Sequence, residues 1–325
     1  MSADAQPRIM VTGASGDSAQ GVIRALRAAD REYFIASVCI NERNPGFLMS
    51  DVSAVAPPCR SEEEYVSFLV DFIEEHQIDV LIPTVDGELL LISERRAEIE
   101  RRSGVRIVVG RHEAVLTCCD KLLTSKYLDV VGVAQPRLIC GGFDEVRRCI
   151  ESGIDVIMKP RLGGGSRGIK VLDTTALRSD DWMIEGYIYQ HFERYVREFT
   201  SVVMKDDGKV RAVAVLERAL SGGRTVWCRR VRSAQYEPML KSVADGLEMP
   251  YLNIQFGAVG DGFQIFDLNP RFSGSTAVFS LVFNGPDLLV WKALTGSMPD
   301  FTCSERYFES MRYHADYVVN GLPNE

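Results

Sequence analysis

Short runs of β-branched residues alternate with stretches of helical periodicity over the first third of the chain. This alternation is typical of a parallel sheet whose strands are connected by helices. The expected strands, and the helix between the first two of them, lie at residues 9–11, 19–29 (the helix), 35–40, 80–82 and 105–109. The pattern therefore predicts a Rossmann-like domain that covers residues 1–112.

Two further helices of this domain can be predicted. Ser61 and Glu64 have the spacing of a capping box, which marks the start of a helix. The apolar stripe of that helix is expected to pack in the core and consists of Tyr65, Phe68, Leu69, Phe72 and Ile73. A second helix is expected over residues 88–102, where a Ser-Gly pair then ends the periodic pattern.

The pattern changes after residue 112. Helices are expected at 121–130 and 144–152, and strands flank a glycine run at 163–165. We interpret residues 113–187 as a small lid domain.

The remaining segment, residues 188–325, is expected to form a third domain in which antiparallel strands dominate. Two hairpins are expected at 198–220 and 252–268, each with a turn that contains Asp and Gly, and a closing helix at 287–294. The chain as a whole is therefore predicted to combine an α/β domain with α+β domains.

The formal net charge of -8 disfavours nucleic-acid binding, because phosphate contacts need a local surplus of Lys and Arg. Residues 1–8 lack the apolar core of a signal peptide, and no run of ~18 apolar residues occurs. The eight cysteines show neither Cys-x-x-Cys pairs nor zinc spacing, so we expect reduced thiols. These features predict a cytoplasmic enzyme that binds neither nucleic acid nor membrane; a homodimer is the commonest assembly for an oligomer.

A cation precedes a glycine-rich turn in the middle of the chain. Lys159 lies in the strand-like stretch Ile-Met-Lys-Pro, and the turn covers residues 163–168. Glycine lets backbone N–H groups approach an anion closely, and a lysine supplies a point charge for phosphate. The pattern suits a lid over a triphosphate, although an ordinary glycine-rich hairpin has the same composition. A P-loop is excluded, because no Gly-Lys-Ser/Thr opens a helix here.

Oxygen-bearing side chains recur on the two strands of the second hairpin. Gln255 lies on one strand, and Asp267 and Asn269 lie on the other. Positions two apart on a strand share a face, so the three side chains can converge. Such ligands suit Mg²⁺ shared with phosphate oxygens. Alternatively, Asp267 and Asn269 only begin the turn before Pro270.

Arg271 opens a turn that also contains Ser273 and Gly274. A guanidinium beside small residues and a helix start can hold a carboxylate or a transferring phosphoryl group. A structural ion pair with an acidic neighbour is the other explanation of Arg271.

Three other segments allow weaker predictions. The turn at 12–16 lacks Gly-x-Gly-x-x-Gly, so dinucleotide binding has little support. Residues 83–88 follow a strand at its carboxyl end, where open sheets bind ligands, but Asp86 as a helix start explains them equally well. Arg230 lies in a basic stretch that either recognises an acidic substrate or forms a solvated strand face.

Five segments in this order resemble the ATP-grasp superfamily, and most of all a single synthetase unit of the carbamoyl-phosphate synthase large chain. The resemblance covers nearly the whole chain. It rests on the segments Cys119-Asp120-Lys121-Leu122-Leu123-Thr124, Ile157-Met158-Lys159-Pro160, Tyr189-Gln190-His191-Phe192, Arg197-Glu198-Phe199 and Asn269-Pro270-Arg271. It implies an ATP-grasp fold with a pre-ATP-grasp domain, a lid and a carboxyl-terminal domain that holds the metal site.

The same resemblance implies roles for particular residues. The nucleotide-binding residues would be Lys121, Lys159, Gly163, Gly164, Gly165, Ser166, Gln190, His191, Phe192 and Glu198, with the last at the ribose. Arg271 and Lys159 would be catalytic. The metal ligands would be Gln255, Asp267 and Asn269, for Mg²⁺ or Mn²⁺. Asp267 stands where a glutamate is more usual, so one-ion and two-ion arrangements both stay open.

The function that the resemblance implies is ligation of a carboxylate to an amine, with ATP forming an acyl phosphate. The substrates would be small molecules, held in part by Arg230, Ser273 and Gly274. Two alternatives stay open: phosphorylation of bicarbonate or carbamate, and a regulator that binds nucleotide without turnover.

Overall fold

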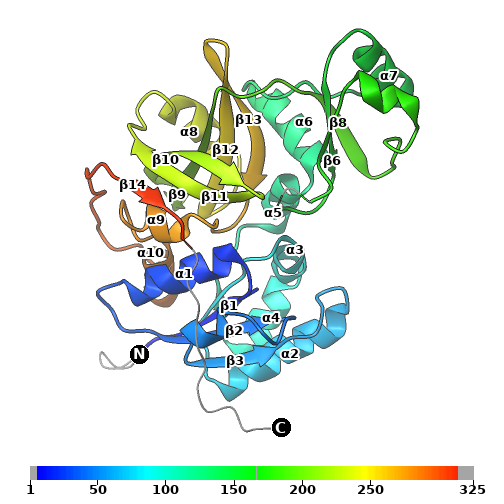
Figure 1. Cartoon of the computed structure of the whole chain (residues 1–325). Helices are drawn as coiled ribbons and strands as arrows, with labels where there is room; N and C mark the ends of the chain where they lie inside the picture. Colours follow the sequence, from blue (N-terminus) through cyan, green and yellow to red (C-terminus); the bar gives the residue numbers. More distant parts are fainter. Residues whose placement is uncertain (1–5, 166, 314–325) are drawn as a thin grey trace.

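The computed structural model describes residues 6–165 and 167–313, and these residues form three sheets. Figure 1 shows a parallel sheet at one end of the molecule, an antiparallel sheet at the other, and a small lobe that projects beside the second sheet. Within the described residues, no helix is both long and apolar enough to cross a membrane.

The parallel sheet has the strand order β3-β2-β1-β4-β5. Its strands are β1 (Arg8–Thr12), β2 (Phe34–Cys39), β3 (Val52–Val55), β4 (Val80–Ile82) and β5 (Arg106–Ile107). The expected parallel α/β domain is therefore present. The short edge strand β3 was not predicted, because its side chains alternate only between half-buried and exposed.

Helices α1 (Asp17–Arg27) and α2 (Glu62–Glu75) lie close to their expected positions. Ser61 caps α2 by position, but its side chain makes no capping hydrogen bond, so the predicted capping box does not form. The stripe of α2 is buried apart from Phe68, which is half-buried.

The helix expected over residues 88–102 is two helices, α3 (Asp86–Glu94) and α4 (Arg96–Ser103). Arg95 separates them with φ -93° and ψ 14°, outside the helical region. Its guanidinium pairs with Glu63 of α2 at 2.7 Å and with Glu98 at 2.5 Å. These ion pairs fix a bend that periodicity alone does not indicate.

The small lobe contains a three-stranded antiparallel sheet in the order β7-β6-β8. Its strands are β6 (Val156–Pro160), β7 (Lys170–Leu172) and β8 (Tyr187–His191), with α7 (Gly142–Glu151) and the short helix η2 (Thr174–Arg178) beside them. Met158, Trp182 and Tyr189 are among the residues of a separate apolar core.

The antiparallel sheet has the order β13-β12-β9-β10-β11-β14. Its strands are β9 (Arg197–Asp206), β10 (Lys209–Ser221), β11 (Arg224–Val231), β12 (Tyr251–Val259), β13 (Gly262–Asn269) and β14 (Glu309–Met311). Both predicted hairpins are present, as β9–β10 and β12–β13. Three helices contribute to the apolar core on one side: α5 (His112–Cys119), α6 (Lys121–Val131) and α8 (Glu237–Asp245).

One continuous apolar cluster joins the parallel and antiparallel sheets. It includes Ile9 of β1, Leu26 of α1 and Leu216 of β10. Phe279 and Leu289 add the helices α9 (Thr276–Phe279) and α10 (Gly285–Thr295) to it. This shared core fixes the two sheets relative to each other, and so holds the cavity between them in shape.

The division of the chain at residues 112 and 187 stays a prediction. Helices α5 and α6 lie in the predicted lid segment but pack in the core of the antiparallel sheet. Strand β8 begins at the second boundary and pairs with β6 of the small lobe. We propose a smaller lid that begins after α6 and ends after β8.

Candidate functional site

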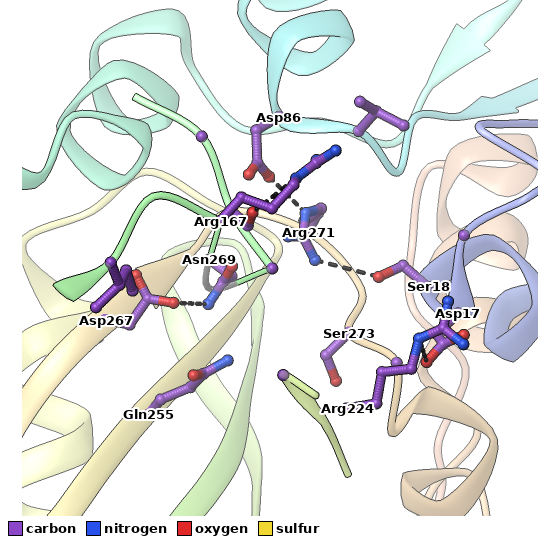
Figure 2. Close-up of a pocket in the computed structure, with 18 of the residues that line it drawn as sticks. Asp17, Ser18, Asp86, Arg167, Arg224, Gln255, Asp267, Asn269, Arg271 and Ser273 are labelled. Atoms are coloured by element: carbon purple, nitrogen blue, oxygen red, sulfur yellow. Dashed lines mark hydrogen bonds and ion pairs between the residues drawn. The ribbon is translucent and has the colours of Figure 1, made fainter. Parts of the chain in front are cut away.

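A cavity of about 1340 Å³ opens where the three sheets meet. Its wall is built from the turns after β1 and β4, the glycine-rich loop, and the end of β13 (Figure 2). Pockets for one small ligand usually measure roughly 300–1,000 Å³. The cavity therefore has room for more than one ligand.

The three predicted metal-site residues come together on the β12–β13 hairpin. Gln255 lies opposite Asp267, and the next pair on the same face brings in Asn269. All three side chains line the cavity. Asn269 Nδ2 donates a hydrogen bond of 2.8 Å to Asp267 Oδ2, which orients both groups (Figure 2).

The oxygens left over on this hairpin suit one hard cation. Asp267 Oδ1 and Asn269 Oδ1 accept no hydrogen bond from the described residues, whereas Gln255 Oε1 already accepts one of 2.7 Å from Arg218. Asp267 is the single carboxylate of the set, and no group of three or more His, Cys, Asp or Glu gathers within the described residues. Two protein oxygens plus phosphate oxygens and water match the coordination habit of Mg²⁺.

Lys159 and Lys121 place positive charge at the same end of the cavity. The Lys159 side chain belongs to β6, and the residue is only 6% exposed. Burial lowers its pKa to about 8, an effect that the negative charge of Asp267 opposes and the positive charge of Lys121 reinforces. Lys121 is the first residue of α6. Its Nζ donates a hydrogen bond of 2.6 Å to the carbonyl of Gly163, which connects it to the glycine-rich loop.

Arg271 forms an ion pair with Asp86, which opens α3 after strand β4. Its Nε donates a hydrogen bond of 2.6 Å to Asp86 Oδ1, and its Nη1 donates one of 3.2 Å to Ser18 Oγ of α1 (Figure 2). The structural explanation of Arg271 is thus present, and so is its place on the cavity wall. Sequence alone did not connect Asp86 with Arg271, because 185 positions separate them.

The glycine-rich loop lies directly over this ion pair. A Cβ on Gly164 would come within 2.7 Å of Asp86 Oδ2 and within 3.6 Å of Arg271 Nη2. A side chain at position 164 would therefore force the Asp86 carboxylate to move. Gly163 and Gly165 have φ of 105° and 70°, the left-handed region that favours glycine. Ser166 lies outside the described residues.

Phe192 and Glu198 also line the cavity. Glu198 Oε1 accepts hydrogen bonds of 2.8 and 2.5 Å from Arg218, whose side chain is largely buried. Arg218 also holds Gln255, so it connects the predicted ribose acid to the metal-site hairpin. Neither Arg218 nor Tyr195, which stacks on Phe266 at 5.1 Å, was predicted.

Three predicted site residues do not line the cavity. Gln190 is buried, and its Nε2 donates a hydrogen bond of 3.1 Å to the carbonyl of Pro136. His191 faces Cys149, with Nε2 3.7 Å from Sγ. Both lie on β8, whose pairing with β6 sets which side each residue faces. Arg230 donates hydrogen bonds to the carbonyls of Ser304 and Arg306, so its guanidinium binds the loop before β14 and not the cavity.

The far end of the cavity contains charged residues that were not predicted. Asp17 of α1 accepts a hydrogen bond from Arg312 Nη1, and Arg224 Nε lies 3.7 Å from Asp17 Oδ2. Arg312 Nη2 also donates a hydrogen bond of 2.8 Å to the carbonyl of Gly274. Figure 2 shows Arg224 and Asp17 beside Ser273. Arg312 and Asp17 are 295 positions apart, so no local pattern points to the pair.

Glu88 is a buried acid in the wall of the cavity. It is 5% exposed, and its Oε2 has no hydrogen-bond partner among the described residues. Burial disfavours the carboxylate and raises the pKa of Glu88 from 4.5 to about 7. The folded protein therefore holds this proton up to a higher pH than the unfolded chain does.

Glu88→Gln is expected to remove a pH dependence of stability. Wild type loses up to about 3 kcal/mol of unfolding free energy as the pH rises from 4.5 to above 7, because only the unfolded chain ionises freely in that window. Glutamine stays neutral throughout. Urea midpoints at pH 5 and pH 8 test this: the variant should match wild type at pH 5 and exceed it at pH 8. Glu94→Gln, on the exposed face of α3, is the matched control.

Solved structures with a similar fold include a synthetase, a biotin carboxylase domain and an L-amino acid ligase. N5-carboxyaminoimidazole synthetase from Staphylococcus aureus, determined with ADP, gives a TM-score of 0.70 at 14% identity, covering 90% of this chain and 78% of that chain. A second similar structure is the biotin carboxylase domain of the Hydrogenobacter thermophilus 2-oxoglutarate carboxylase, determined as a dimer with MgADP, ADP and bicarbonate. Its TM-score is 0.71 at 14% identity, and the match covers 95% of this chain and 75% of that chain. L-amino acid ligase from Bacillus licheniformis gives a TM-score of 0.67 at 13% identity, and the match covers 89% of this chain and 74% of that chain.

The comparisons by sequence give no match. No family model matches the chain, and no curated protein matches it. The structural likeness confirms the expected fold over most of the chain.

Proposed function

We propose that this chain, whose fold is the ATP-grasp fold of those ligases, joins a carboxylate to an amine at the expense of ATP. The observation that supports this most is one cavity wall on which Lys159, Asp267 and Arg271 lie together beneath a glycine-rich loop. Such a set of charges neutralises a triphosphate and the phosphoryl group that leaves it.

Residues at one end of the cavity would bind the nucleotide. Lys121 and Lys159 would contact the phosphates, and the loop that includes Gly163, Gly164, Gly165 and Ser166 would close over them. Phe192, which lines the cavity, would contact the base, and Glu198, oriented by Arg218, would accept hydrogen bonds from the ribose hydroxyls. ADP in the similar structures agrees with this use of the fold.

Asp267 and Asn269 would hold a magnesium ion. MgADP is present in one of the similar structures, and the two unclaimed oxygens suit such an ion. The metal would supply charge neutralisation at the phosphate oxygens. With one carboxylate and with Gln255 engaged by Arg218, we propose one protein-held ion, which Mn²⁺ can replace.

The reaction needs no covalent nucleophile from the protein. A carboxylate oxygen of the substrate attacks the γ-phosphorus, and the bond to the β-phosphate oxygen breaks to release ADP. The amine nitrogen then attacks the acyl carbon, the C–O bond to phosphate breaks, and the amine loses a proton. Arg271, which lies on the cavity wall in an ion pair with Asp86, would neutralise charge on the transferring group. The closed loop would keep water from the acyl phosphate.

Hydroxylamine trapping tests the proposal. With MgATP and a panel of small carboxylic acids, the protein should form hydroxamates and release ADP in equal amounts. ADP release with no hydroxamate from any acid would count against an acyl phosphate. Tight ATP binding with no ADP release under any condition would favour a regulator that does not turn over.

Bicarbonate is the second candidate acceptor. One of the similar structures contains bicarbonate beside MgADP, and bicarbonate presents the same attacking oxygen as a carboxylate. ADP release that depends on added bicarbonate, in the absence of any organic acid, would favour this candidate.

A further inference from the structure

The cavity continues past the nucleotide end to a second group of charges on Asp17, Arg224 and Arg312. Nothing in the proposed binding of ATP uses these residues. The cavity exceeds the usual size of a single-ligand pocket, and these three residues line it. A second ligand would therefore meet this group of charges, which we call the arginine subsite.

Two guanidiniums share one carboxylate in the arginine subsite. Arg312 is fixed twice, by Asp17 and by the carbonyl of Gly274. Arg224 is held loosely, because its Nε lies 3.7 Å from Asp17 and its side chain is 61% exposed. The three side chains together keep one positive charge, in a chain whose net charge is -8. Arg224 thus presents donors in a fork that suits carboxylate or phosphate.

The arginine subsite lies close to the centre of phosphoryl transfer. Asp17 contacts Arg312, and the next residue of α1, Ser18, contacts Arg271. Consecutive Cα atoms are about 3.8 Å apart, so the two contacts diverge from almost one point of the chain. Neighbouring residues of α1 therefore hold Arg271 and the arginine subsite on one wall of the cavity.

Close packing keeps Asp17 in place between the two arginines. A Cβ on Gly274 would lie 3.0 Å from Asp17 Cβ, so the bare backbone at Gly274 lets Asp17 lie against the turn. Ser273, which is buried, lines the same wall. Asp17 thus lowers the net positive charge of the arginine subsite while its side chain stays 25% exposed.

We infer that the arginine subsite binds an anionic group of the acceptor substrate, a carboxylate or a phosphate separate from the carboxylate that is phosphorylated. The inference rests on the proposed ligation for its description of the substrate as an acceptor. The anion site itself does not depend on turnover. The substrate class is therefore a small acid with a second anionic group, and not a simple monocarboxylic acid.

Binding of simple anions tests this directly. The probes are succinate, butyrate and inorganic phosphate, titrated by calorimetry into the full chain saturated with MgADP, so that Lys121 and Lys159 are occupied. Succinate or phosphate should bind, and butyrate should bind at least 10-fold more weakly. The stronger of the two dianions identifies which anion the arginine subsite prefers. No measurable binding of succinate or phosphate would overturn the inference.

Two substitutions should act in opposite directions. Arg224→Gln should weaken dianion binding about 10-fold, because one charge-assisted contact is lost. Asp17→Asn should strengthen it several-fold, because the arginine subsite gains a net positive charge. Arg232→Gln makes the same charge change outside the cavity and should leave binding unchanged. Equal weakening by Arg224→Gln and Arg232→Gln, or weakening by Asp17→Asn, would refute the arginine subsite.

The two proposals fail in different ways. If wild type forms no hydroxamate but shows the expected pattern of anion binding, the ligation is wrong and the arginine subsite stands. Suppose instead that hydroxamates form equally well from succinate and butyrate, and that Arg224→Gln changes neither rate of hydroxamate formation. The ligation then stands and the arginine subsite is wrong.

Discussion

Lys159→Met is expected to lower kcat/KM for ATP by about 10²–10³-fold while leaving the protein at least as stable as wild type. The activity falls because a buried cation no longer faces the phosphates. Stability is kept because burial already disfavours the ammonium, as its pKa of about 8 indicates. Methionine fills a similar volume without a charge.

Initial rates and urea midpoints measure the two effects of Lys159→Met. Lys170→Met is a matched control, since Lys170 lies opposite Met158 on the neighbouring strand β7 and is exposed. The control should keep both activity and stability. A Lys159→Met protein with near-normal turnover would show that the lysine does not contact the phosphates.

Arg271→Gln is expected to lower kcat by about 10³-fold, because the charge that develops on the transferring phosphoryl group loses its neutralising cation. It should also lower the unfolding free energy by about 1–3 kcal/mol. The reason is that Asp86, 21% exposed, is left without its partner. Single-turnover rates of ADP formation and urea unfolding report these two losses separately.

Pairing the substitution with Asp86→Asn separates stability from catalysis. The double variant Asp86→Asn with Arg271→Gln should regain most of the lost stability, since neither group then needs a charged partner. Its kcat should stay as low as that of Arg271→Gln. Recovery of activity in the double variant would mean that Arg271 acts only as a structural partner of Asp86.

The sequence allowed good predictions where local pattern decides the structure. The parallel sheet followed from the alternation of strands and helices, and each hairpin had a turn with Asp and Gly between two apolar strands. The convergence of Asp267 and Asn269 followed from strand periodicity alone. Strand β14 could not be predicted in this way, because three residues have no pattern of their own and are a strand only through pairing with β11.

The rest of the site depends on contacts between distant residues. The family resemblance implied that Gln190 and His191 lie near the nucleotide, but the register of β8 against β6 decides which way each side chain points. Arg230 looked suitable for an anion by composition, yet the carbonyls of Ser304 and Arg306 take its donors. Asp86, Asp17 and Arg312 acquire their partners only when the sheets pack together.

The contact between Asp17 and Arg312 has a consequence for the order in which the site is made. Residues that would bind the nucleotide lie between positions 121 and 271, whereas the arginine subsite needs a residue 295 positions after Asp17. The proposed nucleotide-binding residues are therefore all synthesised before Arg312. The acceptor end is completed only after strand β14 has paired with β11. The proposed acceptor end is thus the last part of the cavity wall to be synthesised.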